Sequence, residues 1–100
     1  MQVNIINTEN NATIRLQGRF DFNSHRDFRA AVDTVLKGPQ AQLTVDFDGV
    51  DYLDSSALGM LLMLRDKAGA ANKTVILANC GGSVRQILDI ANFSKLFSIS

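Results

Sequence analysis

Hydrophobic residues in the first third of the chain change from a spacing of two to the spacing of a helix. Ile14 and Leu16 alternate with polar neighbours, which predicts a β-strand. Val3, Ile5 and Ile6 predict a shorter strand before it. Apolar residues then recur at i, i+3, i+4, i+7 and i+8, which is one face of a helix; they are Phe28, Ala31, Val32, Val35 and Leu36.

Polar residues predict where this first helix begins and ends. Ser24, with Asp27 three residues later, is predicted to cap its start. The Gly38-Pro39 pair predicts its end.

The second part of the chain repeats the alternation of strand and helix. Leu43, Val45 and Phe47 predict a strand, and a helical pattern follows from about Ser55 to Ala70. The continuous apolar run 74–78 predicts a strand covered on both faces.

A last helix is expected from about Ser83, with Ser83 and Gln86 as a capping box. Its apolar face would consist of Val84, Ile87, Leu88 and Ala91. Residues 97–99 add a candidate edge strand.

This order of elements predicts an α/β fold with a mixed, mostly parallel sheet of four or five strands and three main helices. We expect residues 1–100 to form a single domain. In such sheets, functional groups gather where strands end and helices begin. Two junctions qualify, residues 47–56 and residues 78–83.

Composition narrows the class of protein. The chain is 46% hydrophobic, as a packed core requires, and its ten basic residues balance its ten acidic ones. We therefore expect no partner that is recognised by bulk charge, nucleic acid in particular. With one cysteine, no secretion-signal pattern and no apolar run long enough to cross a bilayer, the expected location is the cytoplasm, without membrane insertion.

The junction before the second helix carries the clearest chemistry. Asp54 can cap the helix with its carboxylate, which places Ser55 and Ser56 in the first turn. The simpler interpretation is that these serines only favour the helix start, because serine is common there.

A helical wheel divides this helix into two faces. The core face is predicted to contain Ala57, Met60, Leu61, Leu64, Ala68 and Ala71. The other face would consist of Ser55, Ser56, Gly59, Leu62, Met63 and Asp66. An apolar outer surface beside the serines is typical of a docking site, unless another element of the chain covers it.

The sequence argues against an enzyme. It has no G-x-S-x-G elbow, metal-ligand cluster or phosphate-binding glycine loop, and its single histidine, His25, lies near a helix start. Five aspartates near the predicted strand ends are candidate cation ligands or ordinary turn residues: Asp21, Asp46, Asp48, Asp51 and Asp54. No cofactor is expected.

The stretch Tyr52–Gly59 is similar to the signature Asp-Ser-Ser/Thr-Gly-Leu-Gly of a known family. In this stretch the sequence resembles the STAS domains of bacterial anti-sigma factor antagonists. Residues 16–21, 45–50 and 83–91 are similar to further family segments, in the right order. Two departures are Ala57, in place of the usual glycine, and an end at Ser100, without the further C-terminal helix of many relatives.

The resemblance implies a partner-switching regulator. The unphosphorylated protein would bind a GHKL-type serine kinase that doubles as an anti-sigma factor, or a related regulator. A PP2C-type phosphatase would remove the phosphate. The resemblance makes Ser55 the preferred acceptor and Ser56 the alternative, with Asp21 and Asp54 on the same surface. Such modules also govern biofilm formation, motility and stress responses.

Two other functions stay open for a small STAS protein. It could be a non-catalytic subunit of a bacterial lipid-asymmetry ABC transporter, bound to the ATPase through the same helix without phosphorylation. It could also bind nucleotide, although no phosphate loop supports that.

Overall fold

The computed structural model describes all residues from 1 to 100. Its strands are β1 (Gln2–Asn7), β2 (Asn11–Phe20), β3 (Gln42–Leu53), β4 (Thr74–Ala78) and β5 (Ser98–Ile99). Its helices are α1 (His25–Leu36), α2 (Ser55–Ala70) and α3 (Gly82–Ile90), with short 3₁₀ turns η1 (Phe22–Ser24) and η2 (Phe93–Lys95).

The five strands form one sheet in the order β1-β2-β3-β4-β5. β1 runs antiparallel to β2, and the remaining neighbours are parallel. The predicted mixed, mostly parallel sheet with three helices is therefore confirmed, as is the short edge strand near residue 98.

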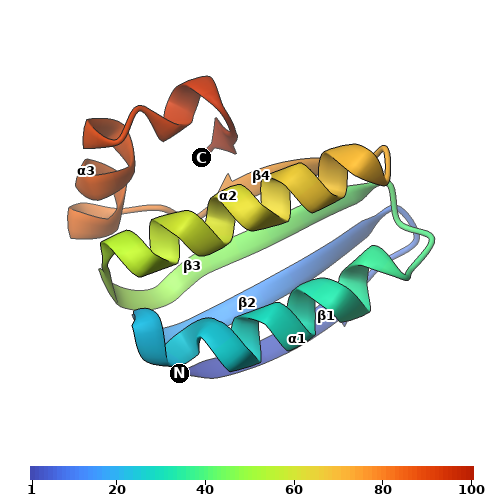
Figure 1. The fold of residues 1–100 in the computed structure, drawn as a ribbon, viewed down its shortest axis with the longest axis horizontal. Coiled ribbons are helices and arrows are strands. Elements are labelled where there is room, and N and C mark those ends of the chain that lie inside the picture. Colours follow the sequence, from blue (N-terminus) through green and yellow to red (C-terminus); the bar gives the residue numbers. More distant parts are fainter.

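The helices lie on one face of the sheet, with α1 and α2 side by side along the strands and α3 at one end (Figure 1). Right-handed crossovers that always step in the same direction place successive helices on the same face. The other face carries Arg15 and Thr74, which are exposed, and Ile76, which is half-buried. The prediction that β4 is covered on both faces is therefore wrong.

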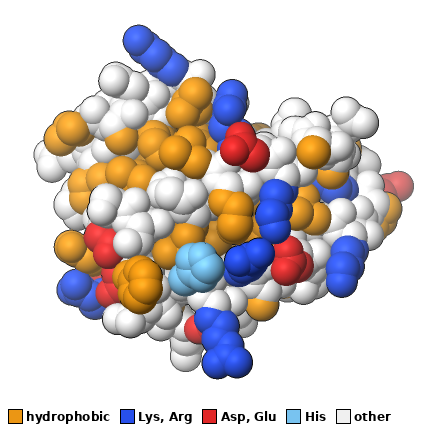
Figure 2. Space-filling view, viewed as in Figure 1, with side chains coloured by type: hydrophobic (Ala, Val, Ile, Leu, Met, Phe, Trp, Pro, Cys, Tyr) orange, Lys and Arg blue, Asp and Glu red, His pale blue; other side chains and the backbone are white.

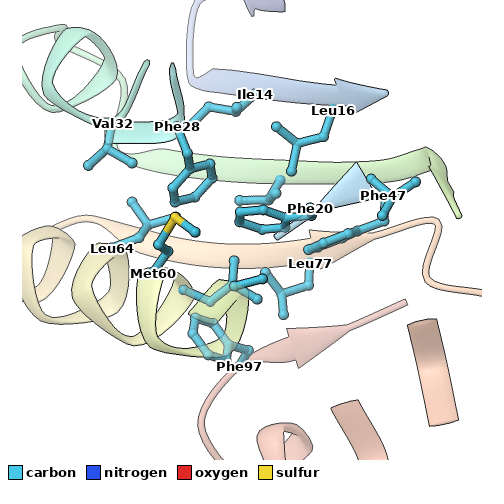
Figure 3. Packing of buried hydrophobic residues seen from close by; sticks show 14 of the residues in the cluster. Ile14, Leu16, Phe20, Phe28, Val32, Phe47, Met60, Leu64, Leu77 and Phe97 are labelled. Atoms are coloured by element: carbon cyan, nitrogen blue, oxygen red, sulfur yellow. The ribbon is translucent and has the colours of Figure 1, made fainter. Parts of the chain in front are cut away.

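The core lies between the sheet and the helices. The Phe20 ring lies 4.9 Å from the Phe28 ring and 6.3 Å from the Phe47 ring, centroid to centroid. Met60 and Leu64 of α2 point into the same space (Figure 3). Because each buried side chain of this size contributes about 1.5–3 kcal/mol, this packing fixes the position of α2 on the sheet.

β3 is longer than the sequence predicted, and this places the start of α2. The sequence placed residues 48–53 in the junction between the strand and the helix, but they continue the strand. Gly49 pairs with Gln17 after one irregularity in the β2–β3 register, and Leu53 pairs with Phe20 after a second. A Cβ on Gly49 would come within 3.0 Å of the Leu16 carbonyl oxygen, so glycine allows this close approach.

Both predicted capping boxes are absent. The Ser24 side chain is buried and makes no cap bond to α1; its hydroxyl donates to the Arg19 carbonyl and accepts from the Asp21 N–H. Ser83 lies inside α3, because Gly81 occupies the cap position. A serine caps a helix only from the residue that precedes the first turn, a position that Ser24 has and Ser83 does not.

Candidate functional site

Asp54 connects the start of α2 to the turn that follows β2. Its Oδ1 accepts from the Ala57 N–H at 2.9 Å, which is the predicted N-cap bond. Its Oδ2 accepts from the Phe22 N–H at 3.3 Å, and its own N–H donates to the Phe20 carbonyl at 3.3 Å. One side chain therefore satisfies backbone donors in two segments that are far apart in the sequence.

The two serines occupy the first turn of α2, as predicted. Ser55 is the first residue of the helix and is exposed, whereas Ser56 is half-buried. The free N–H groups at a helix start give this position a partial positive charge, which favours an added anion by about 0.3–1 kcal/mol. Ser55 therefore offers the more accessible hydroxyl.

Asp21 lies in the turn adjacent to Asp54. Its carboxylate accepts from the Asn23 N–H at 3.0 Å and lies 3.6 Å from Nε of Arg19. The Arg19 guanidinium in turn lies 4.1 Å from the centre of the Tyr52 ring. The structure thus brings Asp21, Asp54 and the serines to one end of the molecule, with an arginine beside Asp21.

The outer face of α2 carries the predicted apolar side chains. Leu62 is 38% exposed and Met63 is half-buried, as expected for a surface that no other element covers. Gly59 is exposed, and a Cβ placed there would meet nothing within 4 Å. Apolar atoms gather over the first half of α2 and toward α3 (Figure 2). Ala71, which was assigned to the core, is exposed because α2 ends at Ala70.

Phe22 belongs to this surface, although the sequence pattern did not single it out. Its side chain is 71% exposed although it is a large aromatic residue. Its N–H bonds to Asp54, so the ring is held close to the start of α2. A phenylalanine in the otherwise polar turn 21–24 is the signal that could have identified it.

Asp46 forms a separate polar cluster on the face of the sheet opposite the helices. Its Oδ1 accepts from Asn79 Nδ2 and from the Asp48 N–H, each at 2.9 Å, and its Oδ2 lies 3.5 Å from Nε of Arg15. Burial by itself raises the pKa of this carboxyl, but the bonds from Asn79 and Asp48 and the Arg15 charge outweigh burial and lower it below 3.8. The cluster joins β2 and β3 to the residue that follows β4.

The remaining candidate chemistry forms no site. No three side chains among the histidine, cysteine and acidic residues come together to hold a metal ion. The largest groove, about 650 Å³, lies along the last turns of α2 and includes Arg65 and Lys95 but neither Ser55 nor Ser56. None of the helices is both long and apolar enough to cross a membrane.

Comparison with known proteins identifies the family. The family model described as "Mlab, STAS domain" matches residues 4–98. A STAS-domain containing protein of Pseudomonas aeruginosa (strain UCBPP-PA14) is 56% identical over 88 residues, which are 88% of this chain and 86% of that protein. The chain is a STAS-domain protein and belongs to this family.

Solved structures show the same fold. The anti-sigma factor antagonist SpoIIAA in its unphosphorylated form superposes with a TM-score of 0.77 at 22% identity, over 99% of this chain and 87% of that chain. The phosphorylated form of SpoIIAA, a Bacillus cell fate determinant, gives 0.75 at 21% identity, over 99% and 91%. A sulfate transporter family protein from Wolinella succinogenes gives 0.77 at 12% identity, over 90% and 73%.

Proposed function

We propose that this protein is a non-catalytic, cytoplasmic regulator that binds a partner when unphosphorylated and releases it when Ser55 is phosphorylated. The observation that carries the proposal is an exposed hydroxyl at the start of a capped helix, beside an exposed apolar face. The existence of phosphorylated and unphosphorylated SpoIIAA structures with this fold supports it. The proposed partners are a GHKL-type serine kinase with anti-sigma activity and a PP2C-type phosphatase.

The switch would act at the surface without refolding the protein. Phosphate adds about −1.5 to −2 charges. The helix start favours this charge, while the neighbouring Asp54 carboxylate opposes it. Because these effects are small and opposed, the fold should persist in both states.

The partner would bear most of the effect. An unpaired charge in a desolvated interface costs about 2–5 kcal/mol. This corresponds to a loss of affinity of roughly 30-fold to several thousand-fold. One phosphate is therefore sufficient to separate the two proteins.

The test is phosphorylation of the purified protein with its cognate kinase and ATP, followed by mapping of the phosphopeptide. We expect phosphate on Ser55, loss of phosphate in Ser55→Ala, and retention in Ser56→Ala. Ser55→Ala should still bind the kinase, whereas Ser55→Asp should bind weakly because it adds about one charge and fewer acceptor oxygens. Phosphate on Ser56 alone would change the residue assignment, and absence of phosphate on both serines would overturn the switch.

The second candidate function is a permanent subunit bound to the ATPase of a lipid-asymmetry ABC transporter. The family description and the occurrence of the fold in a transporter family protein favour it. The same face of α2 would dock without phosphorylation. In this case an ATPase should co-purify with the protein. Ser55→Ala should bind the ATPase as well as wild type does, and cells with either protein should show the same phenotype.

A further inference from the structure

The two edges of the sheet differ in how well they are protected against pairing with another chain. β5 contains only two residues, and a very short edge strand offers little for another chain to pair with. β1 contains six residues, Gln2–Asn7, without a charged residue, a proline or a glycine. Natural proteins commonly prevent pairing at an edge by placing charged residues or proline there. Because β1 has neither, it is an unprotected edge strand.

The β1–β2 register identifies the unpaired backbone groups at this edge. The Thr8 N–H donates to the Asn11 carbonyl at 2.8 Å, so Thr8 and Asn11 form a hydrogen-bonded pair. This pair lies next to the Asn7–Ala12 pair at the end of the β1–β2 ladder. Hydrogen-bonded pairs alternate along antiparallel strands, so Gln2, Asn4 and Ile6 face β2 with their backbone groups. The N–H and C=O groups of Val3, Ile5 and Asn7 therefore point away from the sheet.

Apolar surface lies on both sides of this row of backbone groups. Val3 and Ile5 are half-buried and line a groove of about 310 Å³ between β1 and α1. The groove wall on α1 is formed by short side chains, Ala30, Ala31 and Thr34, together with Asp27. On the opposite face of the sheet, Ile6 is 41% exposed.

We propose that β1 pairs antiparallel with β1 of a second copy of this chain, which joins the two sheets into one. The strand is self-complementary about Asn4. With the two Asn4 residues facing each other across the dyad, Val3 of each copy faces Ile5 of the other, and Gln2 faces Ile6. In this register the free backbone N–H and C=O groups of Val3 in one copy face those of Ile5 in the other. The apolar side chains of these two residues then lie beside each other in the groove.

The expected dimer is weak and leaves the start of α2 free. Six-residue strands bury an area at the low end of specific interfaces, below about 1,200 Å², so we expect dissociation in the micromolar range, on the order of 10–100 μM. β1 is separated from β3 and α2 by β2. The dimer is therefore independent of the proposed phosphorylation.

Sedimentation of the full chain over a range of about 5–500 μM tests the dimer. Wild type should change from monomer to dimer as the protein concentration rises through this range. Asn4→Lys places two like charges opposite each other at the dyad and should weaken dimerisation about tenfold. Gln17→Lys is the control, because it adds the same charge to an exposed position of the same face on β2. A wild type that stays monomeric, or a dimer that Asn4→Lys leaves intact, would overturn the proposal.

Disulfide trapping tests the register. Facing residues of a non-hydrogen-bonded pair have Cα atoms about 4.5 Å apart, within the range for a disulfide. Asn4→Cys should therefore form a covalent dimer on mild oxidation, whereas Gln17→Cys should not. The native Cys80 should not interfere, because it is buried and burial raises its pKa to about 11. Stronger cross-linking by Ile5→Cys than by Asn4→Cys would contradict this register.

Discussion

Asp54 accepts two backbone hydrogen bonds, and two substitutions remove them to different extents. Asp54→Ala loses both the cap bond to Ala57 and the bond from Phe22, so we expect the free energy of unfolding to fall by about 1–2 kcal/mol. Asp54→Asn retains one acceptor oxygen and should lose roughly half as much. Urea denaturation of the three proteins measures this. Equal stability of wild type and Asp54→Ala would show that neither bond matters.

At the residue scale, the sequence predicted positions better than bonding partners. Asp54 was correctly expected to cap α2, because an aspartate directly before a long helical pattern leaves few alternatives. Ser24 was wrongly expected to cap α1, because its hydroxyl is occupied by Arg19 and Asp21 in the turn before the helix. The exposure of Phe22 depends on how that turn meets Asp54, which a linear pattern does not contain.

At the element scale, α2 contains two exposed glycines with open space around them, Gly59 and Gly69. Gly59→Ala and Gly69→Ala should each stabilise the helix, by up to about 1 kcal/mol, because alanine is the better helix former. Under the proposed function, only Gly59→Ala should weaken kinase binding, since Gly59 lies on the docking face one turn from Ser55. Thermal denaturation and calorimetric titration of the kinase measure the two effects. Equal binding by both variants would remove Gly59 from the interface.

The exposed leucine of α2 has a matched control elsewhere on the surface. Leu62 is 38% exposed and Leu96 is 39% exposed. Aspartate at either position should change stability by less than about 1 kcal/mol. Under the proposed function, Leu62→Asp should weaken partner binding about tenfold or more, and Leu96→Asp should not. Unfolding of Leu62→Asp would mean that this side chain is needed by the core.

The sequence defined α2 more accurately than β3. The helix repeats its apolar spacing over sixteen residues, so local pattern alone located it at Ser55–Ala70. The last part of β3 has exposed residues such as Asp48 and Asp51, and its strand conformation depends on pairing with β2. That pairing continues past register irregularities near Gly18, which has a φ of +101°. Such long-range pairing is not visible in a local pattern.

At the scale of the whole molecule, the Asp46 cluster should make stability depend on acid. Its pKa is lower in the folded protein than the ordinary 3.8, so the folded state favours the ionised form. This stabilisation is present above the unfolded pKa and is lost as the pH falls through the folded pKa. Denaturation at pH 7 and at steps below 4 should show wild type and Asp46→Asn converging with acid.

The Arg15 charge provides an internal check on this cluster. Arg15→Gln removes one of the causes that lower the Asp46 pKa, so the pKa of the folded protein rises. The total loss of stability with acid should therefore be smaller than in wild type and be complete at a higher pH. If the difference between wild type and Asp46→Asn were independent of pH, the ionisation of Asp46 would not contribute to stability.

The order of strands in the sheet is the same as their order in the chain, from β1 to β5. No strand has to be inserted between two others that have already paired. As the chain leaves the ribosome, each new strand can therefore add to the edge of what has formed, with its preceding helix closing over the same face. Synthesis from the N-terminus and assembly of the sheet proceed in the same direction, so the core around Phe20 and Phe28 can begin to form before α3 has been translated.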